Sequence, residues 1–298
     1  MALNVVIAGA SGLLGSHLSQ ELIRRNHAVI ALVRRPTSAP DESSWDPHAG
    51  EIDQSVIDAA DVVVNTAGTS LVANPYSKRW ARAMRDSRVN TTRTLAEAIA
   101  TADGRPAFIA NNATGWYGDH GDEIVTEESD SRGDTLLTNI TREWQAATDP
   151  ALEAGARVCV LRTAPVAARK NPLFRIQRPL FRLGLGTRLA GGRQYFPVVS
   201  LSDWVNAAVF LAEHETANGP FNVCAPVTPT NAEYTDALAS VLHRRALLSA
   251  PAAFLRLAGG PMSAEMLNST DARPEALERA GFSFAHRDVR AVLAAEMA

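Results

Sequence analysis

The stretch that decides the fold reads GASGLLG and runs from Gly9 to Gly15. Before it, the apolar run LNVVIA (residues 3–8) predicts a buried strand. After it, apolar residues at helical spacing predict a helix over residues 12–25, and HAVIALV (27–33) predicts a second strand. Strand, glycine turn, helix and strand form a βαβ unit, which requires parallel pairing and a right-handed crossover.

The same alternation continues along the chain to about residue 165. Strands are predicted over residues 61–65, 107–110 and 157–161, and helices over 80–100 and 136–154. Each strand is almost entirely apolar, as expected when helices cover both faces of a parallel sheet. We therefore predict an α/β fold, a Rossmann doubly wound parallel sheet, for residues 1–165.

After Arg162 the alternation stops. Residues 169–197 are rich in Arg, Gly and Pro and predict an irregular or partly helical segment. Helices are predicted over 202–213 and 231–242, a strand over 220–223, and two or three further helices over 251–298. This pattern indicates a smaller, mainly helical C-terminal substrate lobe over residues 166–298, with strands that could return to the Rossmann sheet.

Composition excludes several classes of protein. The net charge is −3, the hydrophobic fraction is 46%, and the arginines are spread along the chain, which argues against nucleic-acid and membrane-surface partners. The sequence contains neither a membrane-spanning apolar run nor a signal-peptide pattern, so we expect a cytoplasmic protein. Cys159 and Cys224 are expected to be reduced core thiols, and the histidines show no metal-binding spacing.

The glycine stretch predicts a dinucleotide site, because it follows a strand and opens a helix. One glycine allows the tight turn, one lets the backbone approach the pyrophosphate, and one lets the helix pack close to the strand. The helix N-terminus then offers free N–H groups and partial positive charge to the phosphates. The alternative is a plain turn, since the spacing G-x-x-G-x-x-G is one residue wider than the common form.

The end of the second strand favours NADP(H) over NAD(H). NAD sites usually carry an acidic residue there for the ribose hydroxyl, whereas NADP sites favour Arg for the 2′-phosphate. Here the strand ends in Arg34 and Arg35, and no acid occurs before Asp41. Ser11 could add a hydroxyl to the same phosphate. The alternative is that one or both arginines are solvated surface residues.

Further motifs, NATGWYGD (112–119), GLGTRLAGGRQYFP (184–197) and RPEALERAGFSF (273–284), carry a family resemblance. With the glycine stretch, they make the chain resemble the short-chain dehydrogenase/reductase superfamily. More closely, it resembles the atypical, extended branch known as the NAD-dependent epimerase/dehydratase family, in its SulA-type (cell-division-inhibitor-like) sugar-epimerase subgroup. The resemblance covers essentially the whole chain and implies NADP(H) binding.

The resemblance also implies where the cofactor lies. The expected contacts are Gly9, Ser11, Gly12, Leu13 and Leu14 to the pyrophosphate, Arg34 and Arg35 to the 2′-phosphate, Thr66, Ala67 and Gly68 to ribose and adenine, Asn112, Ala113 and Thr114 to the nicotinamide, and Thr163 to Val166 to the carboxamide. All of them follow strands, at the edge where open α/β sheets bind ligands.

The residues that usually perform the chemistry are missing. Hydride-transfer members of the superfamily use Ser or Thr with a Y-x-x-x-K pair, in which the Lys lowers the pKa of the Tyr. The corresponding helix, DTLLTNITREW (134–144), has no Tyr, and Asn139 aligns with the Lys. Candidate catalytic replacements are Thr114, Tyr117 and Asn139. Tyr117 would be either a proton donor or substrate contact, or a structural aromatic, and the Thr114 hydroxyl could instead satisfy the strand end.

In the rear lobe, Arg193 and Gln194 are expected to face substrate or cofactor, whereas the family's Trp-Ile-His is replaced by residues 198–200, VVS. The leading hypothesis is an NADP(H)-dependent oxidoreductase acting on a small organic substrate. The alternatives are a redox-neutral epimerase, dehydratase or cyclase of specialised metabolism, and a non-catalytic NADPH sensor. Superfamily relatives often form a homodimer through the helices that correspond to residues 80–100 and 132–153, and the alternative, for atypical members, is a monomer.

Overall fold

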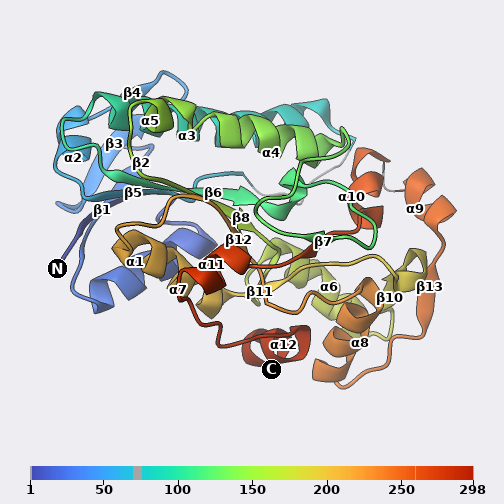
Figure 1. Cartoon of the computed structure of the whole chain (residues 1–298). Helices are drawn as coiled ribbons and strands as arrows, with labels where there is room; N and C mark the ends of the chain where they lie inside the picture. The colour runs from blue at the N-terminus through green and yellow to red at the C-terminus, as the bar shows by residue number, and fades with distance from the viewer. Residues whose placement is uncertain (1, 70–75, 259, 298) are drawn as a thin grey trace.

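The centre of the molecule is an eight-stranded sheet, shown in Figure 1. The computed structural model describes residues 2–69, 76–258 and 260–297. The strand order is β12-β8-β6-β5-β1-β2-β3-β4, and all neighbours are parallel except β3 and β4. The strands are β1 (Asn4–Ala8), β2 (Ala28–Val33), β3 (Glu42–Asp46), β4 (Glu51–Ile52), β5 (Val62–Asn65), β6 (Ala107–Ala113), β8 (Val158–Thr163) and β12 (Gly219–Val223). This topology confirms the predicted Rossmann-type α/β fold.

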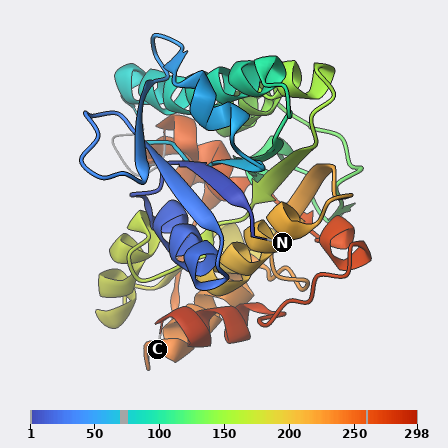
Figure 2. The same ribbon diagram turned by 90° about the vertical axis from the view of Figure 1, so that its left-hand side faces the viewer.

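Helices cover both faces of this sheet (Figure 2). One layer contains α2 (Gln54–Asp58), α3 (Lys78–Thr101), α4 (Leu136–Ala146) and α5 (Asp149–Glu153). The other contains α1 (Leu13–Arg24), α7 (Leu201–Glu213) and α11 (Glu275–Arg279). Each layer has its own apolar core, one around Leu95 and Phe108 and the other around Leu18 and Trp204. The apolar strands predicted from the sequence are thus buried on both faces.

A smaller lobe lies beyond the carboxyl ends of the strands, at the right of Figure 1. Its helices are α6 (Pro172–Arg182), α8 (Asn231–Val241), α9 (Ala252–Ala258), α10 (Ser263–Leu267) and α12 (Val289–Met297). Three short strand pairs complete it: β7 (Ile124–Val125) with β14 (Asp271–Ala272), β9 (Val166–Ala167) with β11 (Val199–Ser200), and β10 (Thr187–Leu189) with β13 (Leu248–Ala250). Single turns of 3₁₀ helix are η1 (Thr114–Trp116), η2 (Ala190–Gly192) and η3 (Gly260–Met262).

The division at residue 165 stays a prediction, and the structure shows the strand return that was allowed for in the second segment. Helix α7 and strand β12 come from the second segment, yet β12 pairs with β8 and α7 packs into the core below the sheet. The lobe is therefore built from residues 166–200 and most of 224–297. The residues between these two ranges form α7 and β12, which belong to the sheet and its helix layer. The C-terminal segment, expected to hold two or three helices, forms α9, α10, α11 and α12.

The helix predicted over 136–154 is two helices, α4 and α5. Pro150 lies in the first turn of α5 and has no backbone N–H, so it cannot donate the hydrogen bond that would continue α4 into α5. The chain therefore turns after α4, where Ala147 is the C-cap.

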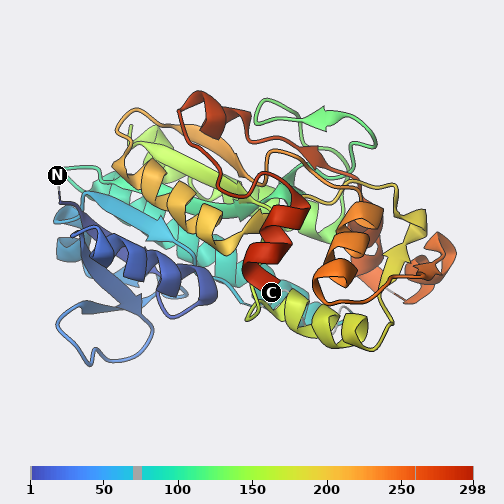
Figure 3. The ribbon, with the colours of Figure 1, turned by 90° about the horizontal axis from the view of Figure 1, so that it is seen from below.

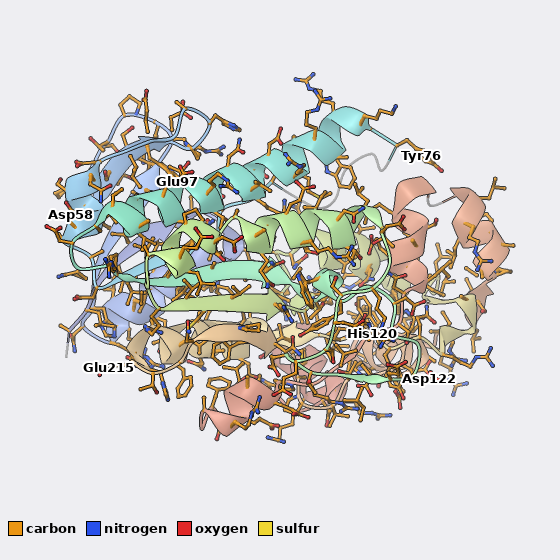
Figure 4. All side chains as sticks on the ribbon, turned by 45° about the horizontal axis from the view of Figure 1, so that its top comes forward. Asp58, Tyr76, Glu97, His120, Asp122 and Glu215 are labelled. Carbon is orange, nitrogen blue, oxygen red and sulfur yellow. The ribbon has the colours of Figure 1, made fainter. Side chains whose placement is uncertain are left out.

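Figure 4 marks the two ends of the sheet. Asp58 and Glu215 precede strands β5 and β12 and lie at one end, whereas His120 and Asp122 follow β6 and lie at the other. The loops that follow strands thus gather at the carboxyl edge, where ligands of open α/β sheets bind.

Two predictions about individual segments can be checked directly. Both cysteines are free and buried, which confirms the expected core thiols. Among the described residues, none of the helices combines the length and apolar character that a bilayer span needs.

Candidate functional site

The glycine loop joins β1 to α1 and fits closely against the end of β5. Gly9 has φ +86°, and a Cβ there would lie 2.7 Å from the backbone nitrogen of Ala67. A Cβ on Gly15 would overlap the carbonyl oxygen of Gly9. Both positions therefore require glycine, one for its backbone conformation and one for the close packing of α1 on the loop.

The N-terminus of α1 is open to a ligand. Gly12 is the N-cap, and no side chain caps the helix. Ser11 and Gly12 are exposed, and Leu13 and Leu14 are half-buried. Because the first N–H groups of a helix have no partner within it, this turn presents donors and partial positive charge. The residues present fit a pyrophosphate.

Arg34 and Arg35 differ in their surroundings, although both are exposed at the end of β2. The Arg35 guanidinium makes two hydrogen bonds to the Glu42 carboxylate, at 2.9 and 2.5 Å. These bonds hold the pKa of Glu42 at about 2. Within the part of the chain that the structure describes, the Arg34 side chain makes no hydrogen bond or ion pair, so Arg34 is the arginine available for a 2′-phosphate.

The loop after β5 is held from two sides. The Thr66 hydroxyl donates to the Ala8 carbonyl, and the Ala67 N–H donates to the side chain of Asn65, which fixes the loop against β1. Gly68 lies against the guanidinium of Arg88, to which a Cβ would approach within 3.3 Å.

Arg88 on α3 is a residue whose role the sequence left open. It is buried, it donates to the carbonyls of Met84 and Thr69, and burial lowers its pKa to about 10. It supports the wall of the site from behind rather than contacting solvent.

The end of β6 brings Asn112 and Thr114 to the carboxyl edge. Asn112 is buried and donates to the carbonyl of Thr141, so it ties α4 to the sheet. Thr114 begins η1 and is also buried. Its hydroxyl has no hydrogen-bond partner among the described residues, which leaves it free for a ligand.

Tyr117 lies in a buried network, not in an open cleft. Its side chain is fully buried, and its hydroxyl donates to Asn222 at 2.7 Å and accepts from Arg162 at 2.9 Å. Burial raises its pKa to about 12. The Arg162 guanidinium stacks 3.4 Å from the centre of the Trp116 ring. This geometry supports the structural alternative for Tyr117, because the phenol does not face a space that a substrate could enter.

Asn139 stays a predicted catalytic residue, but its surroundings do not favour that role. It is exposed on the outer face of α4 and donates to the carbonyl of Asp134. The residues that face η1 are Leu137 and Thr141, which lie 3.6 and 4.0 Å from the Cβ position of Gly115. These two residues contribute neither a phenol nor an amine to the part of α4 that lies against η1.

At the end of β8, Thr163 and Val166 are both buried. The Thr163 hydroxyl donates to Asn111 at 2.6 Å and accepts from the Trp204 indole at 3.1 Å. Thr163 therefore shapes the edge, and a direct bond from its hydroxyl to a cofactor stays a prediction.

In the lobe, Arg193 is exposed and Gln194 is half-buried. The Gln194 amide donates to the carbonyls of Leu189 and Met266, so it joins the η2 segment to α10. Arg193 makes no hydrogen bond or ion pair with its side chain in the described ranges, and it stays a predicted substrate contact.

Glu265 was not predicted from the sequence. Its carboxylate, on α10, accepts from the backbone N–H of Leu137 at 2.9 Å, at the start of α4. Burial raises its pKa. The residues are separated by 128 positions, and no local pattern signals that they meet. Glu265 therefore brings a titratable group to the start of the helix that lacks the Tyr and Lys.

The described side chains contain no cluster of three or more His, Cys, Asp or Glu residues that could hold a metal ion.

Comparison with known proteins identifies matches over most of the chain. Residues 5–224 match the family model described as NAD dependent epimerase/dehydratase family, and residues 250–296 match a domain of unknown function (DUF1731). The "Epimerase family protein Mb2239" of Mycobacterium bovis is 39% identical and covers 96% of this chain and 94% of its own. The mouse "Epimerase family protein SDR39U1" is 29% identical over 98% of each chain.

Comparison with solved structures also identifies epimerase family proteins. The human epimerase family protein SDR39U1, crystallised with NADPH, is 26% identical with a TM-score of 0.86, and the match covers 99% of each chain. A nucleoside-diphosphate sugar epimerase from Corynebacterium glutamicum is 32% identical with a TM-score of 0.81, covering 100% of this chain and 58% of that one. These matches support the family resemblance but not the SulA-type subgroup.

Proposed function

The chain belongs to the NAD dependent epimerase/dehydratase family, and we propose that it is an NADP(H)-dependent oxidoreductase of the atypical short-chain dehydrogenase/reductase type, acting on a small organic substrate. The observation that carries the proposal is the open glycine loop at the uncapped N-terminus of α1, with the unpaired Arg34 at the end of the next strand. A structural relative that binds NADPH supports it.

Each part of the site has a binding role in this proposal. The first N–H groups of α1 bind the pyrophosphate, and Arg34 binds the 2′-phosphate with a planar guanidinium suited to it. Thr114 and the end of β6 lie beside the nicotinamide. When bound, NADPH supplies a hydride to the substrate carbon.

The substrate oxygen then needs a proton, and Glu265 is the candidate donor. Its carboxyl adjoins the start of α4 through Leu137, which also packs against η1 beside Thr114. Since burial raises the pKa of Glu265, the carboxyl keeps its proton to higher pH than an exposed glutamate. The Thr114 hydroxyl would orient the same oxygen.

One observation favours a second candidate, a redox-neutral epimerase, dehydratase or cyclase. The side chains of α4 that lie against η1 are Leu137 and Thr141, and they supply neither a phenol nor an amine. The Thr141 hydroxyl is bonded within its own helix, to the carbonyls of Leu137 and Thr138. A non-catalytic NADPH sensor would share this feature.

The deciding experiment mixes purified protein and NADPH with each member of a panel of ketones, enones and imines and follows the absorbance of reduced nicotinamide. We expect oxidation with at least one class, reduced about 10²-fold or more in Glu265→Gln and falling as pH rises through the raised pKa of Glu265. Thr114→Val should also reduce turnover, whereas Thr216→Val, a matched change in an exposed loop, should not. NADPH binding without oxidation of any substrate would shift the assignment to the redox-neutral candidate or the sensor.

The remaining expectations belong to the same proposal. The partner is a small-molecule substrate, and the protein acts in the cytoplasm. Neither nucleic acid nor a membrane is expected as a partner.

A further inference from the structure

A hollow in the surface lies against α6, separate from the glycine loop and Arg34. It has a volume of about 700 Å³, and its charged lining consists of Arg169, Lys170, Arg175, Arg178 and Arg182. The rest of the lining is apolar, and no carboxylate contributes to it. Helix α6, yellow-green in Figure 3, runs along the outer edge of the molecule.

The helix is anchored by an adjoining face. Phe174 and Phe181 are buried in the core of the lobe, and the Tyr234 hydroxyl of α8 donates to Gln177 at 2.5 Å. Residues 175, 178 and 182 then share one face, because they are three and seven positions apart. The arginines are thus presented by a fixed helix.

Among the described residues, these five cations have no counter-ions. None of their side chains makes an ion pair or a hydrogen bond there, whereas other arginines do pair with carboxylates, as Arg188 does with Asp236. The Nε of Arg178 is buried without a partner. Burial, with Arg182 and Arg169 nearby, lowers the pKa of Arg178. Clustered like charges without partners destabilise a helix surface, and an anion in the hollow would offset that cost.

We propose that this hollow binds a phosphate-bearing anion, a small soluble ligand with a diphosphate or more than one phosphate group. Guanidinium groups bind phosphate oxygens through paired hydrogen bonds, and several of them converge here on one concave space. The volume exceeds that of a single phosphate ion, so the hollow also has room for part of an organic group. The site shares no lining residue with the proposed NADP(H) site, and the inference does not depend on that proposal.

The test is calorimetric titration of the whole protein with inorganic pyrophosphate, alone and with saturating NADPH. We expect binding in both conditions, weakened by salt. Arg178→Gln and Arg175→Gln should each weaken it about tenfold or more, and Arg178→Lys should have an intermediate effect. Arg82→Gln removes the same charge from an exposed position on α3, and it should leave pyrophosphate binding unchanged.

Thermal unfolding without ligand controls for folding. Arg178→Gln should keep or raise the Tm, because it relieves repulsion. Pyrophosphate binding that the α6 variants do not weaken, or that NADPH abolishes, would overturn the proposal. So would cosedimentation with phosphatidic acid vesicles in the absence of pyrophosphate binding, since the anion would then be a lipid headgroup.

Discussion

At the scale of single residues, Tyr117 shows how burial decides a role. The motif NATGWYGD places a phenol just after β6, near the expected nicotinamide, but the backbone of η1 turns the ring inward. There it links Asn222 of β12 to Arg162 of β8. The motif is therefore informative about how the carboxyl edge of the sheet folds, because the Tyr117 hydroxyl joins the neighbouring strands β8 and β12.

Tyr117→Phe tests this role. The change leaves the Asn222 oxygen without its donor and removes one of the acceptors of Arg162, so we expect a loss of about 1–3 kcal/mol in the free energy of unfolding. Urea denaturation measures it, and the Kd for NADPH should not change. Loss of turnover at unchanged stability would instead restore Tyr117 as a proton donor.

Glu127 gives a pH-dependent prediction. It is buried, one of its oxygens accepts from the Asn222 N–H, and the other has no partner. Burial raises its pKa above the ordinary value of 4.5. The contribution of Glu127 to stability is therefore complete below about pH 4.5 and is lost as pH rises through the raised pKa.

Glu127→Gln keeps an acceptor for the Asn222 N–H and removes the buried charge. The Tm of this variant, relative to that of the unchanged protein, should rise as the pH increases from about 4.5 through the raised pKa of Glu127. Circular dichroism at several pH values measures the difference. A difference independent of pH would contradict the raised pKa.

At the scale of elements, the first turn of α1 combines a packing constraint with a binding surface. Gly15 packs directly against the backbone carbonyl of Gly9. Gly12, by contrast, has an ordinary φ of −76° and is exposed. The two glycines should therefore respond differently to the same substitution.

Gly15→Ala should lower the free energy of unfolding by about 1–3 kcal/mol, because the methyl group overlaps the Gly9 carbonyl. Gly12→Ala should have a smaller effect on stability but weaken NADPH binding, since its methyl group would stand where the pyrophosphate approaches. Tm and Kd, measured on both variants, separate the effects. Equal losses of Tm would show that the loop is only a structural turn.

The elements also show what sequence reasoning can reach. Periodicity and the glycine loop predicted the strands of the parallel sheet, since each is set by local apolar pattern. A catalytic role for Asn139 could not be settled from the sequence, because a shift of one or two residues moves a side chain to another face of a helix. Glu265 was missed because its contact with Leu137 depends on how α10 docks, which is a property of tertiary packing.

At the scale of the whole molecule, the lobe and the sheet are interleaved. Strand β12 returns to the sheet, and Glu265 and the β7–β14 pair connect the lobe to the carboxyl edge. The lobe is therefore held to the sheet at several points along the chain.

A homodimer through α3 and α4 remains a prediction. The outer surface of these helices carries Arg82, Arg93 and Glu97, together with the ion pair between Arg85 and Glu143. An interface there would be polar, which is typical of weaker or exchangeable association.

The most direct test of the central claim is calorimetric titration with NADPH and NADH of the unchanged protein, Arg34→Gln and Arg35→Gln. Because Arg34 is unpaired and Arg35 is held by Glu42, NADPH should bind more tightly than NADH. Arg34→Gln should remove most of that preference, about tenfold or more, and Arg35→Gln should remove less. Absence of NADPH binding at high micromolar concentration, or a preference that survives Arg34→Gln, would contradict the account.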